Sequence, residues 1–409
     1  MKSSSLALPC ILFFISTPPL EAKEALLVSL QSIPDRVEKQ NPDLIAAREL
    51  IAEAAGRNHQ AGRLSNPELG IDVTHDPGFH ERSLSVGIAQ KFPLTKRLAL
   101  EKAASATSLL AAKAEVHDVE RRLTAEAREL LIKLLAIGKQ KQLLKQQQSL
   151  ANQLADYIND AAKKGEGSVL DAGQAKLEAA QLTNQLRQLS AESAILNGQL
   201  KALLGMTTSE PLIVSGSLPE ISPPSRSVNP ENRPDLKAAK LNAHAAGQTA
   251  LLERAKSRDD IEVFLSAGLE RTEDAPEGYD TESRFGIGFR IPLPLWNNNE
   301  GAIQEADARK NRKQKEVAAL AHNIRHEAST AHAEMAEWAK ITNEISGNLL
   351  PMARKQAELA LKAYHEGQGD LQITLRSREQ VLNLASARLN ALRDFHLAKT
   401  RYEAALARP

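Results

Sequence analysis

The quartet Asn41-Pro42-Asp43-Leu44 returns in the second half of the chain as Arg233-Pro234-Asp235-Leu236. Two further landmarks return in the same order, each roughly 190 to 200 residues after its first occurrence, which indicates a tandem repeat. They are Gly87-Ile88 with Phe92-Pro93-Leu94, matched by Gly286-Ile287 with Ile291-Pro292-Leu293, and Gly165-Glu166-Gly167, matched by Gly367-Gln368-Gly369. We therefore expect a first repeat over 35–215 and a second over 233–409, joined by a Pro- and Ser-rich connector over 216–232.

Each repeat predicts a helix, a strand pair and a long helical hairpin. Residues 95–164 contain no proline and one glycine, so a continuous helix there would extend ~105 Å at ~1.5 Å per residue. Apolar residues seven apart predict supercoiled packing against neighbouring helices; they are Leu109, Val116, Leu123, Leu130, Ile137 and Leu144. The pattern predicts hairpins over 95–204 and 301–408, the second interrupted by a break near Gly347–Pro351.

The strand pairs, expected over 67–92 and 259–293, alternate apolar residues with charged or small ones. This alternation is typical of a transmembrane β-strand, but a water-soluble sheet that covers a helix shows it too. Four strands are too few to close a barrel, and lipid does not tolerate an open sheet edge. A membrane role therefore requires oligomerisation, with eight strands from two protomers or twelve from three. The charged side chains of the alternating face would then line the barrel lumen; they are Glu68, Asp72, Glu262, Glu270, Arg284 and Arg290.

Composition narrows the classes of protein further. There are 52 basic and 51 acidic residues, a formal net charge of +1, which gives no electrostatic argument for a nucleic-acid partner. Residues 1–22 resemble a secretory signal peptide, with an early Lys2 and the apolar run Leu6–Ile15. The single cysteine, Cys10, lies inside this segment after Pro9, where a lipoprotein signal would have a small residue.

The sequence offers no constellation for catalysis or for a cofactor. His326-Glu327 starts like a zinc-protease helix, but Thr330 stands where the second histidine of that motif belongs. His322 and His326 share a helix face, yet zinc sites usually need three or more protein ligands. We therefore expect no enzyme, no cofactor and no metal site.

Specific motifs resemble the TolC-type outer membrane factors over essentially the whole mature chain. They are Asn41-Pro42-Asp43-Leu44 leading to residues 60–69 (QAGRLSNPEL), residues 90–94 (QKFPL) and residues 291–297 (IPLPLWN). The last run is most similar to the heavy-metal branch typified by CzcC and CusC. The resemblance implies a homotrimer in the outer membrane of a Gram-negative bacterium, with mixed α and β structure. It implies a twelve-stranded barrel in outer membrane lipid, continued by a long periplasmic coiled-coil tunnel of helices.

The same resemblance implies the partners and the cargo. They are a periplasmic adaptor and an inner-membrane resistance-nodulation-division pump, and heavy-metal cations such as cobalt, zinc, cadmium, copper or nickel. In such proteins the hairpin tips contact the adaptor and form the periplasmic constriction. The matching tip positions are Gly165, Gly167, Val169, Leu170 and Asp171, and in the second repeat Gly367, Gly369, Asp370 and Leu371.

Three charged residues lie one to two turns inside the second tip. Arg376, Arg378 and Glu379 are candidates for ion pairs between protomers at the constriction, or are solvated helix charges with little effect. Two other functions stay open at this stage. One is a periplasmic coiled-coil adaptor or scaffold, and the other is a duct for drugs in place of metals.

Overall fold

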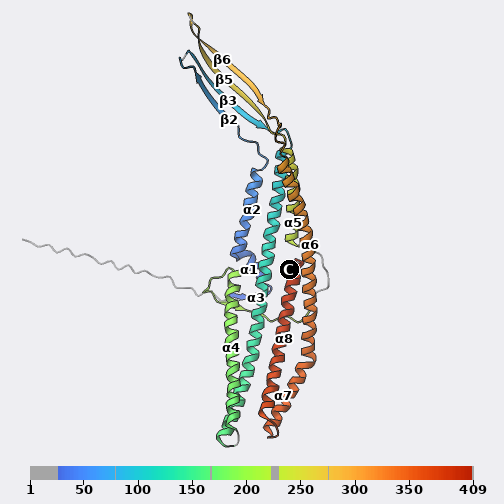
Figure 1. Ribbon diagram of the computed structural model, residues 1–409. Helices are drawn as coiled ribbons and strands as arrows, with labels where there is room; N and C mark the ends of the chain where they lie inside the picture. Colours follow the sequence, from blue (N-terminus) through green and yellow to red (C-terminus); the bar gives the residue numbers. More distant parts are fainter. Residues whose placement is uncertain (1–25, 79, 166–167, 223–229, 275, 408–409) are drawn as a thin grey trace, which may run out of the picture.

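The computed structural model describes residues 26–78, 80–165, 168–222, 230–274 and 276–407. The expected signal segment, Cys10 and Gly167 lie outside these ranges. The molecule is elongated, with a four-stranded sheet at one end, long helices along its length and two hairpin tips at the other end (Figure 1). Across the described ranges, no helix is long and apolar enough to cross a membrane.

The longest element is helix α3, which runs over 67 residues from Arg97 to Lys163. Of the six residues spaced seven apart, Val116, Leu130, Ile137 and Leu144 are buried. They are buried because α3 packs against α2 (Pro42–Gln60) beside the sheet and against α4 (Val169–Leu203) towards the tip. Asn41 joins these two shorter helices end to end: its side chain caps α2 at the Leu44 amide and donates to the Leu203 carbonyl.

The second repeat has the same plan, built from α5 (Pro234–Ala255), α6 (Glu300–Glu344), α7 (Leu350–His365) and α8 (Leu371–Ala405). Near the expected break at Gly347–Pro351, a π-helical turn over Ile345–Leu349 interrupts the regular α-helix, but the chain stays helical from α6 into α7. Pro351 follows this turn directly, as the second residue of α7, so the proline stands where the spacing of the helical hydrogen bonds changes. The wider turn thus lets one long helix pass through a glycine and a proline.

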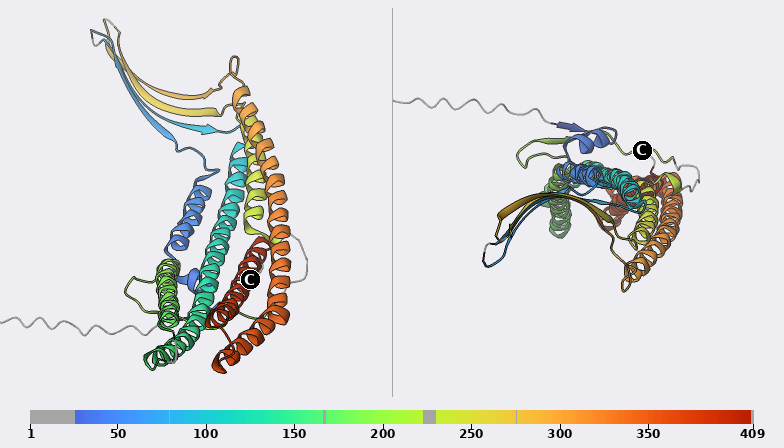
Figure 2. Two further views of the ribbon diagram at one scale, coloured as in Figure 1. Left: turned by 60° about the horizontal axis from the view of Figure 1, so that its bottom comes forward. Right: turned by 90° about the horizontal axis from the view of Figure 1, so that it is seen from above.

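The sheet joins the two repeats. Strands β2 (Glu68–His75), β3 (Glu81–Phe92), β5 (Ile261–Asp274) and β6 (Gly278–Arg290) are antiparallel in the order β2-β3-β5-β6, and the sheet is curved (Figure 2). Strands β5 and β6 are paired as far as Asp274 and Gly278, so the connection between them is short. Gly278 makes this tight reversal with a φ of +102°.

Smaller elements pack on the middle of the helices. Strand β1 (Leu26–Val28) pairs in parallel with β4 (Leu212–Val214), and α1 (Ile33–Gln40) buries Ile33 and Val37 in the core of the first repeat. A short 3-10 helix, Pro230–Asn232, precedes α5. The described start of the connector crosses α8, where the buried His396 ring nitrogen lies 2.9 Å from the Pro219 carbonyl oxygen.

Candidate functional site: the polar sheet face and the helical tips

One face of the sheet carries the charged residues expected in a lumen. The pairing register places Asp72 in one row with Ser85, Gly268 and Arg284, and Glu262 in another with Lys91 and Arg290. Because side chains alternate along each strand, every second residue shares this face, which we call the polar face. All six candidates lie on it: Glu68, Asp72, Glu262, Glu270, Arg284 and Arg290.

Ion pairs between neighbouring strands balance part of the charge on the polar face. Arg284 pairs with Glu270, Arg290 pairs with Glu262, and the Lys91 ammonium lies 3.2 Å from Glu68. Lys91 was not among the sequence candidates, although its place in the alternation would have identified it. The face therefore presents both signs of charge to whatever lies in front of it.

Phe264 breaks the alternation because it also lies on the polar face. Its ring covers Gly288 on the neighbouring strand, so closely that a Cβ at Gly288 would lie 2.2 Å from the Phe264 ring. Arg290 sits over the same ring, with its guanidinium carbon 5.9 Å from the centroid. The glycine, missing a side chain of its own, makes room for the one large apolar group on this face.

The opposite face of the sheet is apolar and exposed in the single chain. We call it the apolar band. Phe285 is 85% exposed, Leu69 70% and Ile287 68%, values far above those of core residues. Its large members are Leu69, Ile71, Val73, Leu84, Val86, Ile88, Leu265, Leu269, Phe285, Ile287 and Phe289. A contiguous apolar surface of this kind marks contact with lipid or with another protein.

The first hairpin reverses between Lys163 and Val169. Gly165 has a φ of +78°, which favours glycine, and the Ser168 hydroxyl caps α4 by accepting from the Leu170 and Asp171 amides. Val169 and Leu170 are each 78% exposed, so this tip presents apolar side chains to its surroundings.

The second hairpin reverses by similar devices but buries its apolar residue. Gly367 has a φ of +72°, and the Asp370 carboxylate accepts from the Gln372 amide at the start of α8. Gly369 lies so close to α7 that a Cβ there would be 2.7 Å from the Tyr364 nitrogen. Leu371 is only 3% exposed, because it packs among residues of the first hairpin such as Leu154 and Ile158. The two tips are therefore not equivalent.

The three constriction candidates line one groove of about 690 Å³ between α3, α4 and α8. Arg378 donates to the Leu150 carbonyl at 3.4 Å, while burial lowers its pKa. Glu178, which the sequence did not single out, lies in the same groove, and burial raises its pKa although the Arg378 charge opposes this. Arg376 and Glu379 are exposed on the same helix.

The histidines considered as metal ligands do not form one cluster. His322 and His326 have ring centroids 4.4 Å apart on α6, whereas the His332 ring lies against Tyr402 at 5.5 Å. Near the far end of the sheet, His80 pairs with Glu273. Among the described residues, no three His, Cys, Asp or Glu side chains are grouped so as to hold a metal ion.

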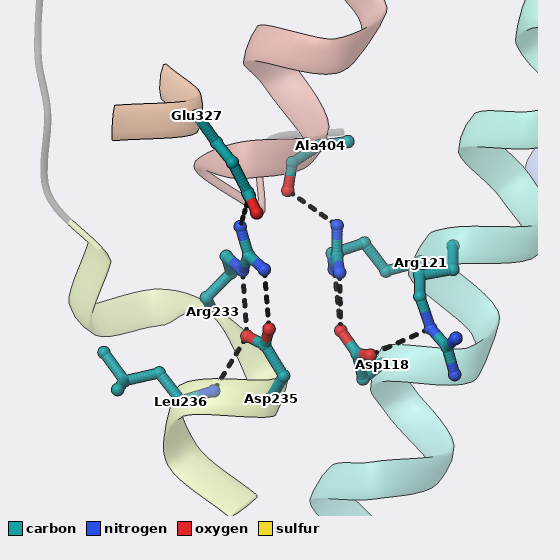
Figure 3. Close-up of polar contacts among 8 residues, drawn as sticks. Asp118, Arg121, Arg233, Asp235, Leu236, Glu327 and Ala404 are labelled. Carbon is teal, nitrogen blue, oxygen red and sulfur yellow. Dashed lines mark hydrogen bonds and ion pairs between the residues drawn. The ribbon is translucent and has the colours of Figure 1, made fainter. Parts of the chain in front are cut away.

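A cluster of charges that sequence reasoning missed fixes the start of α5 (Figure 3). The Arg233 side chain is only 7% exposed. It makes a bidentate contact with the Asp235 carboxylate, and it also pairs with Glu327 of α6 at 2.6 Å. Beside it, Arg121 of α3 pairs with Asp118 and donates to the Ala404 carbonyl at the end of α8. Burial alone would raise the pKa of Asp235, but the hydrogen bonds and charge of Arg233 outweigh it and hold that pKa below its ordinary value.

The sequence matches no protein-family model, and no curated protein matches it. The structure is similar to the outer-membrane channel OprN, with a TM-score of 0.76 and 17% identity over 93% of this chain and 90% of that one. For the outer membrane protein VceC of Vibrio cholerae the TM-score is 0.75 and the identity 19%, over 92% and 95% of the two chains.

CusC gives a TM-score of 0.76 at 16% identity, over 93% of this chain and 92% of its own. Its values are no better than those of OprN and VceC, so the likeness does not single out one branch of these channels. With both repeats and the sheet included in each match, the chain has the fold of the TolC-type outer-membrane channels.

Proposed function

We propose that this chain is the outer-membrane channel subunit of a tripartite efflux system. The observation that carries the proposal is the two-faced sheet at the end of the long helices. Its apolar band is exposed in one chain, and its polar face gathers every candidate lumen residue. A soluble sheet would bury one of these faces, whereas a barrel in lipid turns the apolar one outward and the polar one inward.

The assembly follows from the open edges of the sheet. Strands β2 and β6 each have a neighbour on one side only, and lipid does not tolerate such edges. Three copies, joined β6 to β2, would close a twelve-stranded barrel, and the hairpins below it would form a continuous helical tunnel. We take three copies in preference to two because the sequence motifs resemble those of the TolC-type outer membrane factors, a resemblance that implies a homotrimer.

In this assembly the chain has no catalytic step. Substrate would pass through the tunnel and the barrel, driven by an inner-membrane pump to which a periplasmic adaptor joins the hairpin tips. The mixed charge of the polar face suits a path that binds no ion tightly, because a strong site would slow transit. For the cargo we propose heavy-metal cations, on the resemblance of residues 291–297 to the heavy-metal branch.

Cell fractionation tests the location, and susceptibility tests the cargo. The full-length chain should be recovered from the outer membrane as a trimer, and recovery as a soluble periplasmic monomer would contradict the proposal. A strain lacking the chain should become sensitive to cobalt, zinc, cadmium, copper or nickel and keep its tolerance of drugs. The reverse pattern would assign the duct to drug efflux and leave its location standing.

A further inference from the structure

Two arginines face each other on the apolar side of the sheet, at the end farthest from the helices. Arg82 of β3 is directly opposite Arg271 of β5, one row beyond Leu84 and Leu269 of the apolar band. Successive rows on one face are about 6.6 Å apart along a strand, so this pair sits immediately at the rim of the band. Both side chains are exposed, and His75 continues the row on β2.

Like charges directly opposite each other destabilise a strand pair, so the arrangement needs an explanation. Among the side chains that the structure describes, none forms an ion pair with Arg82 or Arg271. Glu273, the next residue of β5 on this face, already pairs with His80. The two arginines therefore keep their positive charge at the edge of the apolar band.

An aromatic ring lies under both guanidinium groups. The guanidinium carbon of Arg271 is 4.6 Å from the centroid of Tyr279, and that of Arg82 is 5.9 Å away. The ring attracts both cations and so keeps them together over one spot. Tyrosine is also one of the residues enriched where a membrane protein meets the headgroup level.

We propose that Arg82 and Arg271 bind the phosphate of a lipid headgroup at the outer rim of the barrel. The inference rests on the proposed function, because it needs the apolar band to face lipid. The acyl chains of such a lipid would lie along Leu84 and Leu269, and its headgroup would then reach the arginine row. Guanidinium groups bind phosphate oxygens through paired N–H donors, and this charge would offset the repulsion between the arginines.

The test uses the purified full-length protein, first floated with phosphatidylcholine vesicles to establish insertion. Native mass spectrometry of the trimer in dodecyl maltoside then measures the retention of phosphatidic acid, with diacylglycerol as the matched lipid that has no phosphate. Glycerol 3-phosphate serves as the free headgroup. The sheet variant is Arg82→Gln/Arg271→Gln. Its control, the α2 variant, is Arg48→Gln/Arg57→Gln, which removes the same charge from the exposed surface of α2.

We expect the wild type to retain phosphatidic acid over diacylglycerol, and the sheet variant to bind phosphatidic acid at least tenfold more weakly, about 1.4 kcal/mol. The α2 variant should bind like the wild type. Equal retention of phosphatidic acid by the sheet variant and the α2 variant would overturn the site. Retention of diacylglycerol by the wild type equal to that of phosphatidic acid would also overturn it. Binding of glycerol 3-phosphate as tight as that of the lipid would also overturn it, in favour of a soluble anion. Failure to float would instead reject the proposed function itself.

Discussion

Two adjacent residues of β3 allow the orientation of the sheet to be tested with a single change of charge. Val86 belongs to the apolar band and Ser85 to the polar face, directly opposite Asp72. The band extends from Leu269 to Ile261 along β5, about 26 Å at ~3.3 Å per residue, or roughly 20 Å across the membrane at a tilt of about 40°. Val86 lies one row from its centre, at a depth of roughly 5 Å from the midplane.

An arginine near the midplane of a barrel's lipid face costs about 2–4 kcal/mol. Val86→Arg should therefore destabilise each chain by about 2–3 kcal/mol, and a trimer with three copies by about 6–9 kcal/mol. Ser85→Arg adds the same side chain one residue away, but it faces the lumen beside Asp72 and should change stability by less than about 1 kcal/mol. The contrast between the two variants, and not either value alone, reports which face meets lipid.

The assay is urea titration of protein folded into vesicles, with outer-membrane recovery and trimer bands on unheated gels as a check in cells. Val86→Arg should shift the midpoint strongly downward and reduce trimer recovery, whereas Ser85→Arg should follow the wild type. If Val86→Arg were as stable as Ser85→Arg, the apolar band would not face lipid. If Ser85→Arg were the damaging variant, the two faces would be assigned the wrong way round.

Three further predictions concern other parts of the chain. Trp296 is 93% exposed just beyond β6, where we expect the membrane interface. In a Trp338→Phe background, which leaves Trp296 as the one tryptophan, its fluorescence should be quenched most by lipids brominated near the headgroup. Quenching by acrylamide in the water phase with no quenching by brominated lipids would contradict this position. Arg233→Met should lower the melting midpoint by about 4 °C, for a loss of about 3 kcal/mol in a chain of this size, and adding Asp235→Asn should restore part of it. The pKa of Asp235 is lower in the folded chain than in the unfolded chain, so the Asp235 carboxylate stabilises the fold at a pH above its unfolded pKa. This stabilisation is lost as the pH falls through the lower, folded pKa. Thermal scans of Arg233→Met should therefore lack this dependence on acid. Gly369→Pro should abolish metal tolerance while trimers still form, and unchanged tolerance would remove this tip from the adaptor contact.

The sequence was sufficient for those features that depend on local periodicity. The mixed helix-and-sheet class is confirmed, and α3 appears where 70 residues without proline predict a helix. The alternation along each strand is visible in the sequence, so the residues that share a face follow once the strands pair. The register of strand pairing matters here, because a shift of one residue would move all these side chains to the other face of the sheet.

Features that depend on contacts between distant segments were not predictable in this way. Arg233 and Glu327 are 94 positions apart, and nothing in either local pattern links them. The pairing of β3 with β5, which joins the repeats, likewise depends on where α3 and α5 place the strand ends. The π-helical turn was missed for a different reason, because glycine and proline signal a break locally while packing of Ile345 and Leu350 keeps the helix together.

The duplicated chain uses equivalent positions for different purposes, and the two tips illustrate this. Val169 and Leu170 project from the first hairpin, whereas Leu371 is buried against that hairpin. Burying a leucine stabilises a fold by about 1.5–3 kcal/mol, so the second tip is held by its contact with the first. A partner that docks on apolar side chains therefore finds them on the first hairpin. Near its turn the second hairpin offers the Asp370 carboxylate and, three residues further on, the apolar side chain of Ile373, which is 54% exposed and therefore less prominent than Val169 and Leu170. An adaptor that engages both tips must accordingly recognise two different surfaces, even though the sequence repeats between them.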